Sequence, residues 1–231
     1  MMKNEKDELT VIIKGGGPIG TILATSDAKG MVRGYVQNPD VQVENYPNGK
    51  LNVAGAVGTD GYVQVIKDLG LKEPYIGSYP LVSGEIAEDF ANYFQTSEQK
   101  QTAVALGVLV DKNGVRASGG YIITPMPDAT EEEISKVEKA IFEAGAISKM
   151  LDNNLTLKEI AQKVTGDKNI RTIDASMEPE YECECTKERF ADGLMTIGKE
   201  QLKELIKDDG KAEIKCQFCN KVYNFNKEEL E

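Results

Sequence analysis

Alternating apolar and polar positions run through the first half of the chain and predict a series of β-strands. Short runs rich in β-branched residues are separated by breaks containing glycine, proline or asparagine, as in antiparallel hairpins. The hairpin signal is strongest at Asn113-Gly114, because this dipeptide suits a tight turn between two strands. The predicted strands are residues 9–14, 19–24, 31–36, 41–43, 51–56, 62–67, 103–110 and 115–123.

One helix is predicted within this β-rich region, over residues 84–94, where Ser83 can provide the N-cap. Three apolar residues at helical spacing share one face: Ile86, Phe90 and Tyr93. Three carboxylates fall in the first turns: Glu85, Glu88 and Asp89. Carboxylates suit the positive end of the helix dipole. We therefore interpret them as a solvated face and not as a pair for acid–base chemistry.

Helical periodicity replaces alternation after Pro125 and Pro127. Two capping boxes, Thr130 with Glu133 and Thr156 with Glu159, each predict a helix start. Apolar residues at helical spacing follow the first box: Ile134, Val137, Ile141, Ala144, Ile147 and Leu151. Amphipathic helices are not stable alone, so we expect these to pack on the β-rich region. They could be ordinary packed helices or a metastable linker whose release exposes apolar surface.

The last fifty residues predict two short helices and a hairpin. Thr186 can cap a helix that ends at Gly198, and a second helix precedes residues 208–210. Residues 212–225 predict the hairpin. The apolar residues of the two helices are Phe190, Leu194 and Ile197, then Leu202, Leu205 and Ile206.

Composition narrows the possible functions of this 231-residue chain. Its net charge of −11 disfavours general binding to nucleic acid. The absence of histidine excludes Ser-His-Asp and Cys-His catalysis and mixed Cys/His metal sites. The charged start lacks the apolar core of a secretion signal, and no apolar run is long enough for a membrane helix, so we expect a cytoplasmic protein.

The glycine-rich stretch at residues 15–20 could suggest a phosphate-binding loop. Such a loop must open a helix, so that amide groups at the helix N-terminus face the anion. Here a β-rich run follows, and no lysine stands in the required place. We therefore expect a strand break where two backbones approach closely, and no bound nucleotide.

All four cysteines lie near the C-terminus, in a C-x-C pair and a C-x-x-C pair separated by thirty residues. Two such pairs can supply four thiolates to one tetrahedral Zn²⁺, which makes a single zinc ion the expected cofactor. About fifty residues form a thin core, so a metal cross-link is physically reasonable. The expected ligands are Cys183, Cys185, Cys216 and Cys219.

Other interpretations of the cysteines remain open. Permanent disulfides, free structural cysteines and a purely structural zinc site are each possible. A zinc ribbon that binds nucleic acid would have a basic, aromatic face, whereas this region mixes lysine with many carboxylates. A thiol oxidoreductase would place C-x-x-C at a helix start, whereas Cys216 and Cys219 lie between strand-like runs.

Residues 180–190 (EYECECTKERF) and 216–219 (CQFC) closely resemble the 33 kDa chaperonin family, the redox-regulated heat-shock holdases of bacteria. Further similar stretches lie upstream: residues 84–89 (GEIAED), Tyr93-Phe94, residues 97–99, Gly119-Gly120 and Pro127. The resemblance covers essentially the whole chain. Family members usually carry a further segment before the point where this chain begins, so the N-terminal domain is expected to be incomplete.

The resemblance implies an α+β fold with three parts. A β-rich N-terminal domain for client binding and dimerisation, shortened at its start, would span residues 1–128. A metastable helical linker would span residues 129–178, and a small α/β redox-switch module that binds zinc would span residues 179–231. Four linker residues are expected to contact clients: Ile134, Val137, Ile141 and Ile147.

The function implied by the resemblance is that of an ATP-independent holdase, not an enzyme, that binds unfolding proteins under oxidative stress. The reduced, zinc-bound form would be inactive. Oxidation would form the disulfides Cys183–Cys185 and Cys216–Cys219, release zinc and unfold the linker. The expected partners are unfolded clients and possibly a second copy, with no nucleic acid, membrane or nucleotide. The alternative is a zinc-stabilised interaction protein, or a zinc-ribbon binding protein, without redox switching.

Overall fold

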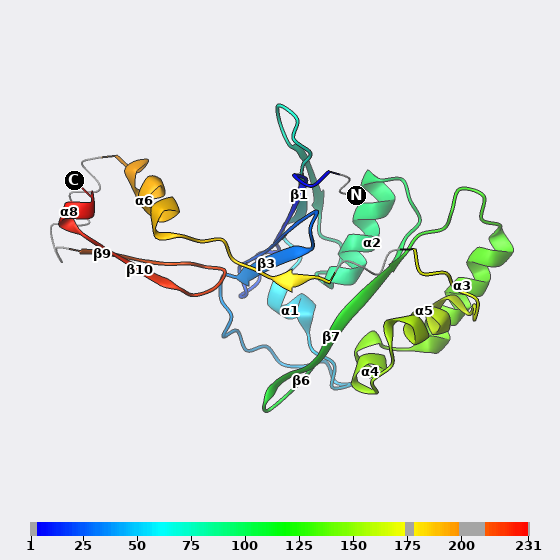
Figure 1. The fold of residues 1–231 in the computed structure, drawn as a ribbon. Helices are drawn as coiled ribbons and strands as arrows, with labels where there is room; N and C mark the ends of the chain where they lie inside the picture. The colour runs from blue at the N-terminus through cyan, green and yellow to red at the C-terminus, as the bar shows by residue number, and fades with distance from the viewer. Residues whose placement is uncertain (1–3, 174–177, 199–210, 231) are drawn as a thin grey trace.

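The computed structural model describes residues 4–173, 178–198 and 211–230, and a six-stranded mixed sheet lies at its centre (Figure 1). The strand order is β5-β4-β1-β2-β3-β8, and all neighbours are antiparallel except β3 and β8. The strands are β1 (Glu8–Lys14), β2 (Thr21–Asp27), β3 (Met31–Val36), β4 (Tyr62–Asp68), β5 (Tyr75–Pro80) and β8 (Glu180–Tyr181).

A separate hairpin is formed by β6 (Ala103–Asp111) and β7 (Gly114–Ile123), with its turn at the predicted Asn113-Gly114. The register shifts by one residue between Leu109 and Val110, where a β-bulge interrupts the ladder. Figure 1 shows this hairpin as a long ribbon between the central sheet and the helices α3–α5.

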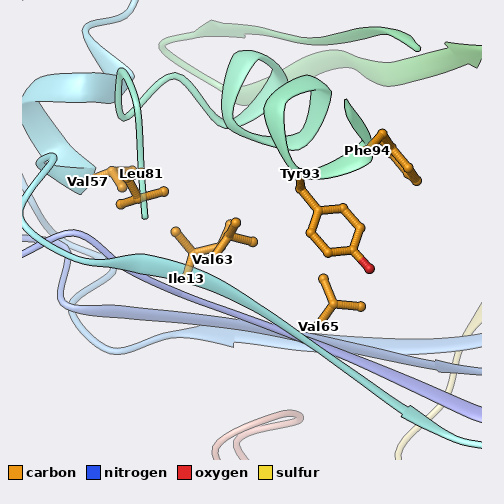
Figure 2. Close-up of a cluster of buried hydrophobic side chains, with 7 residues drawn as sticks. All are labelled: Ile13, Val57, Val63, Val65, Leu81, Tyr93 and Phe94. Carbon is orange, nitrogen blue, oxygen red and sulfur yellow. The ribbon is translucent and has the colours of Figure 1, made fainter. Parts of the chain in front are cut away.

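The main core lies where α2 (Ile86–Ser97) crosses the sheet (Figure 2). Tyr93 of the helix points toward Val65 of β4 and is 1% exposed, and Phe94 belongs to the same buried cluster. The predicted apolar face is confirmed, because Ile86 and Phe90 pack against this cluster. The cluster consists of Ile13, Val57, Val63, Val65, Leu81, Tyr93 and Phe94.

Two predicted strands are wrong. Residues 41–43 have no regular structure, and residues 51–56 contain the short helix α1 (Val53–Val57). The Asn52 side chain accepts a hydrogen bond from the Gly55 amide at 2.7 Å, which starts the helix. The apolar run therefore forms a helical turn that buries Val57, because this local cap outweighs β-propensity. Strand β5 was not predicted, since Pro74 precedes it, Pro80 is its last residue, and it lies at the sheet edge.

The glycine-rich stretch is a strand break with close backbone contact, as predicted. The Gly17 amide donates to the Val57 carbonyl at 2.8 Å, and the Asp60 amide donates to the Gly15 carbonyl at 3.0 Å. A Cβ atom on Gly15 or Gly17 would collide with main-chain atoms of residue 57. The glycines thus let the end of β1 lie directly against α1.

The interpretation of Asp89 as a solvated residue is wrong, as is the prediction of Ser83 as N-cap. Glu85 is the N-cap of α2, with no side-chain capping bond. Asp89 is 2% exposed, and its Oδ1 accepts hydrogen bonds from the amides of Val82 (2.6 Å) and Ser83 (3.1 Å). This carboxylate therefore joins α2 to the turn that follows β5.

The predicted helices after Pro127 are present, but the first is divided. Gly145 has a φ of 76°, which ends α3 (Glu131–Ala144) before α4 (Ile147–Asp152) begins. Both capping boxes are formed, and α5 (Leu157–Thr165) ends at Gly166 as predicted. Helices α3 and α5 pack on each other, while α4 packs on the β6–β7 hairpin. The expected packing on the β-rich region is thus confirmed.

Part of the hairpin surface under α4 is glycine backbone, and the side chains of Tyr121 and Ile123 pack beside it. A Cβ on Gly107 would lie 2.8 Å from Ile147 Cγ2, and one on Gly119 would lie 2.5 Å from Leu151 Cδ1. Arg116 of β7 fixes the far end of α4, since its Nη2 lies 2.8 and 2.9 Å from the two carboxylate oxygens of Asp152. We call Gly107 and Gly119 the glycine seat.

Replacing Thr156 by alanine should destabilise α5 by about 1 kcal/mol, because the Thr156 side chain accepts a bond from the Glu159 amide. The Glu159 carboxylate accepts in return from the Thr156 hydroxyl, which lowers the pKa of Glu159 below its usual 4.5. The stabilisation that the ionised Glu159 carboxylate gives to the start of α5 is therefore present at neutral pH. It is lost as pH falls through the lowered pKa of Glu159. Amide exchange of α5 measures the effect, and the exposed Lys158→Ala is the control. Equal protection in both variants at neutral pH would contradict it.

The C-terminal module comprises α6 (Lys187–Met195), β9 (Lys211–Lys215), β10 (Val222–Asn226) and α8 (Lys227–Leu230). Thr186 caps α6 as predicted, but the helix ends at Met195, so Ile197 lies beyond it. The hairpin is confirmed as β9–β10. The second predicted helix, with Leu202, Leu205 and Ile206, lies outside the described residues. In Figure 1 the module and α3–α5 lie on opposite sides of the central sheet.

Among the described residues, no helix is long and apolar enough to cross a membrane.

Candidate metal centre

Two separate loops bring the four cysteines together. Cys183 and Cys185 lie between β8 and α6, while Cys216 and Cys219 lie in the turn between β9 and β10. The turn is closed by a bond from the Asn220 amide to the Cys216 carbonyl and one from the Cys216 amide to the Lys221 carbonyl, both 2.9 Å. This knuckle directs both of its sulfurs toward the C-x-C loop.

The sulfur positions fit a tetrahedral metal ion. All four Sγ atoms lie within 4.8 Å of one another. Two contacts join the loops, with the Sγ atoms of Cys183 and Cys216 at 3.6 Å and those of Cys185 and Cys219 at 3.3 Å. Sulfurs bound to one Zn²⁺ at about 2.3 Å in tetrahedral geometry lie about 3.8 Å apart. The donor set and its spacing therefore match what zinc requires.

A tyrosine from β10 completes the site. The Tyr223 hydroxyl lies 3.2 Å from Cys185 Sγ and donates to the Cys185 carbonyl at 2.7 Å. This contact lowers the pKa of the Cys185 thiol to about 7, and burial raises the pKa of the Cys183 thiol to about 12. The thiols of Cys183 and Cys185 are thus shifted in opposite directions, and a cation bound between them would favour the thiolate form of both.

The core beneath the cysteines is small. Among the described residues, its buried members are Leu194, Tyr223 and Phe225, with Phe190 and Ile214 packed beside them. Cys216 is 2% exposed, whereas Cys219 is exposed. Three buried side chains contribute little apolar burial, so cross-linking by a metal would supply a large share of this module's stability.

The chain matches the family described as Hsp33 protein over residues 1–226. It is 56% identical to the 33 kDa chaperonin of Clostridioides difficile and 45% identical to that of Alkaliphilus metalliredigens, covering all of this chain and 79% of each relative. The crystal structure of the 33 kDa chaperonin from Thermotoga maritima superposes with a TM-score of 0.90 at 39% identity, over 98% of this chain and 77% of that one.

The chain belongs to the Hsp33 family. The resemblance found in the cysteine motifs and the α+β fold is thereby confirmed. Hsp33 proteins are a family of chaperones, not of enzymes.

The residues predicted to contact clients in this Hsp33 family member fall into two groups. Ile134, Val137 and Ile141 line a groove of about 430 Å³ between α3 and the end of the β6–β7 hairpin. Ile147 lies apart from them, 4% exposed against the glycine seat. The structure thus brings three of the four together at one surface and buries the fourth.

Several residues at the Hsp33 site were not predicted from the sequence. Tyr223 contacts Cys185, Tyr181 bonds to the knuckle, and Phe218 packs on Arg33 of the central sheet. Phe218 lies between the two knuckle cysteines and Tyr181 two residues before Cys183. Their closeness in sequence to the cysteines could have marked Phe218 and Tyr181 as site residues. Nothing in the sequence marks Arg33.

Proposed function

We propose that this Hsp33 family member is a redox-regulated holdase that prevents aggregation of unfolding proteins without ATP. The observation that carries the proposal is the convergence of Cys183, Cys185, Cys216 and Cys219 within 4.8 Å, in a chain of a chaperone family. A holdase needs no catalytic residues and no nucleotide. It needs an apolar surface that is covered at rest and a chemical event that uncovers it.

In the reduced state, we infer that the four thiolates hold one zinc ion. Bound zinc would join the C-x-C loop to the knuckle and contribute on the order of 10–16 kcal/mol of apparent binding free energy. Tyr223 would keep Cys185 oriented toward the ion through its hydroxyl. The small core of Leu194, Tyr223 and Phe225 then remains folded.

Oxidation by hydrogen peroxide would remove these ligands in two steps for each cysteine pair. One thiolate attacks a peroxide oxygen, the O–O bond breaks, and hydroxide leaves, which gives a sulfenic acid. The neighbouring thiolate attacks that sulfur, an S–S bond forms, and a second hydroxide leaves. Two electrons thus pass from the sulfurs to the peroxide. We propose the pairs Cys183–Cys185 and Cys216–Cys219, which the family resemblance implies. Since Cys183–Cys216 and Cys185–Cys219 are also close, peptide mapping must decide.

Each of the three predicted parts of the chain has its own role in the proposed mechanism. Residues 1–128 would bind clients and possibly dimerise, residues 129–178 would act as a metastable linker, and residues 179–231 would sense oxidants. Helices α3 and α5 contact each other more than they contact the sheet, so heat should release them readily. Their release would expose the apolar side chains of Ile134, Val137 and Ile141.

The test is to expose the reduced, zinc-loaded protein to peroxide at raised temperature. Zinc release, measured with a colorimetric chelator, should accompany loss of helicity and the appearance of holdase activity toward a heat-denatured client. A thiol reductant and zinc should reverse all three. Retention of zinc under peroxide, or zinc loss without suppression of aggregation, would contradict the proposal. The first result would favour a zinc-stabilised interaction protein without a redox switch.

A further inference from the structure

The outer edge of strand β3 is covered by residues from the two cysteine loops. β8 pairs with β3 in parallel over only two positions, Met31 with Glu180 and Val32 with Tyr181. The Glu180 amide donates to the Gly30 carbonyl at 3.0 Å. The Glu182 amide donates to the Val32 carbonyl at 3.2 Å. Without this short segment β3 would be an open edge of the sheet.

A tyrosine hydroxyl takes the place of the next amide along this edge. The Tyr181 hydroxyl lies 3.1 Å from the Gly34 carbonyl oxygen, and also 2.5 Å from the Phe218 carbonyl oxygen. The carbonyls of residues 30, 32 and 34 thus form a regular outward row, spaced two residues apart. The Gly30 and Val32 carbonyls each accept from an amide of the covering segment, whereas the Gly34 carbonyl shares the single Tyr181 hydroxyl proton with the Phe218 carbonyl.

The ring of Phe218 closes the same edge from the knuckle side. It meets the Tyr35 ring edge-on at a centroid distance of 5.6 Å, and the Arg33 guanidinium lies 5.5 Å from its centre. Arg33 also lies 4.0 Å from Glu184, which stands between Cys183 and Cys185. We call Glu180, Tyr181 and Phe218 the edge cover.

The edge cover depends on the geometry of the cysteine cluster. Tyr181 precedes Cys183 by two residues, and Phe218 lies within the knuckle itself. The Tyr181 hydroxyl bonds to the Phe218 carbonyl, so the two parts of the cover, each adjoining one cysteine pair, contact each other directly. By contrast, helices α3–α5 lie on the opposite side of the sheet from the C-terminal module (Figure 1). The direct contact of the module is therefore with β3.

We propose that the outer edge of β3 is a strand-addition site for an extended segment of an unfolded client protein. This proposal rests on the proposed holdase function and names one surface that oxidation uncovers. An unfolded chain carries free main-chain amides in any sequence, and the outward carbonyls of β3 accept such donors at strand spacing. Main-chain pairing gives affinity without sequence preference, which suits a chaperone with many clients.

The first test uses a fluorescent peptide of alternating valine and threonine and the same peptide methylated on alternate amide nitrogens. Methylation removes the donors that face β3 while keeping the side chains. The oxidised, zinc-free protein should bind the plain peptide at least about tenfold more tightly, because two or three hydrogen bonds are lost at about 1 kcal/mol each. Hydrogen exchange of residues 31–36 should rise on oxidation and fall again when the peptide binds.

The second test opens the edge without oxidant. Phe218→Ala removes the ring from the knuckle, and Tyr181→Phe removes the hydroxyl while keeping the ring. In the reduced, zinc-loaded state both should loosen the pairing of the Glu180 and Glu182 amides with β3 and bind the plain peptide more tightly than the parent protein, whereas Gln217→Ala, an exposed neighbour, should not. Zinc content measured beside binding shows that the cysteine cluster is intact.

The results of these tests distinguish a failure of the strand-addition proposal from a failure of the proposed holdase function. Equal binding of the two peptides by oxidised protein, or unchanged exchange of β3, would overturn the strand-addition site even if aggregation is suppressed. Suppression of aggregation together with selective binding of the plain peptide supports both. Failure of the oxidised protein to suppress aggregation would contradict the proposed holdase function itself.

Discussion

Cys216→Ser should lower the zinc affinity of the reduced protein about 100- to 1,000-fold. If four thiolates share on the order of 10–16 kcal/mol equally, each supplies about 2.5–4 kcal/mol. Cys216 is the most deeply buried of the four, so a serine there also leaves a hydroxyl in an apolar site. Competition with a chelator of known affinity measures the loss. The near-ultraviolet signal of Tyr223 should fall with it, since that ring packs in the module core.

The matched control is Gln217→Ser, which places the same side chain one residue further along the same turn. Gln217 is exposed, so this variant should bind zinc like the parent protein. Undiminished zinc affinity in Cys216→Ser would show that the cluster does not bind the metal through four sulfurs. The holdase activity of Cys216→Ser should also appear without oxidant, because the thin module core is then without its cross-link.

Asp89→Ala should lower the free energy of unfolding of the β-rich region by about 3 kcal/mol. Its Oδ1 accepts bonds from the amides of Val82 and Ser83, and hydrogen bonds to an ionised group contribute about 1.5–3 kcal/mol each. The expected loss lies at the lower end of the sum of the two bonds, because burying the carboxylate is itself costly. Among the described residues, its Oδ2 is buried without a hydrogen-bond partner. Urea unfolding followed by tyrosine fluorescence measures the change.

Glu88→Ala is the control on the same turn of α2, since Glu88 is exposed. Its effect should stay within about 0.5 kcal/mol. A similarly small effect of Asp89→Ala would mean that the turn after β5 is held by other contacts. Asp89→Asn keeps one acceptor oxygen and should lie between the two.

The sequence predicted those elements whose signals are local. Two capping boxes, the Asn113-Gly114 turn and the strand at 31–36 were all found, because neighbouring residues determine them. Some errors arose where distant contacts decide, and others where a local cap or glycine ended a continuous apolar pattern. Asp89 was interpreted as solvated because only tertiary structure brings the turn after β5 onto it. The continuous apolar pattern at 134–151 concealed the break at Gly145, which has a positive φ.

The candidate site was predicted in its chemistry but not in its surroundings. The spacing of the cysteines was sufficient to predict that Cys183, Cys185, Cys216 and Cys219 lie in one cluster. The docking of the knuckle on β3 could not be predicted, since Arg33 and Phe218 are 185 positions apart in the sequence. Contacts between residues so distant in sequence leave no periodicity within either segment.

The glycine seat has a consequence for how α4 is retained. A surface made of backbone at Gly107 and Gly119 offers few shape features by which one apolar helix could be told from another. Apart from the Arg116–Asp152 ion pair, its occupation by α4 therefore depends on the short connections that keep this helix at high effective concentration. Any foreign apolar segment delivered at comparable local concentration would compete for the same place.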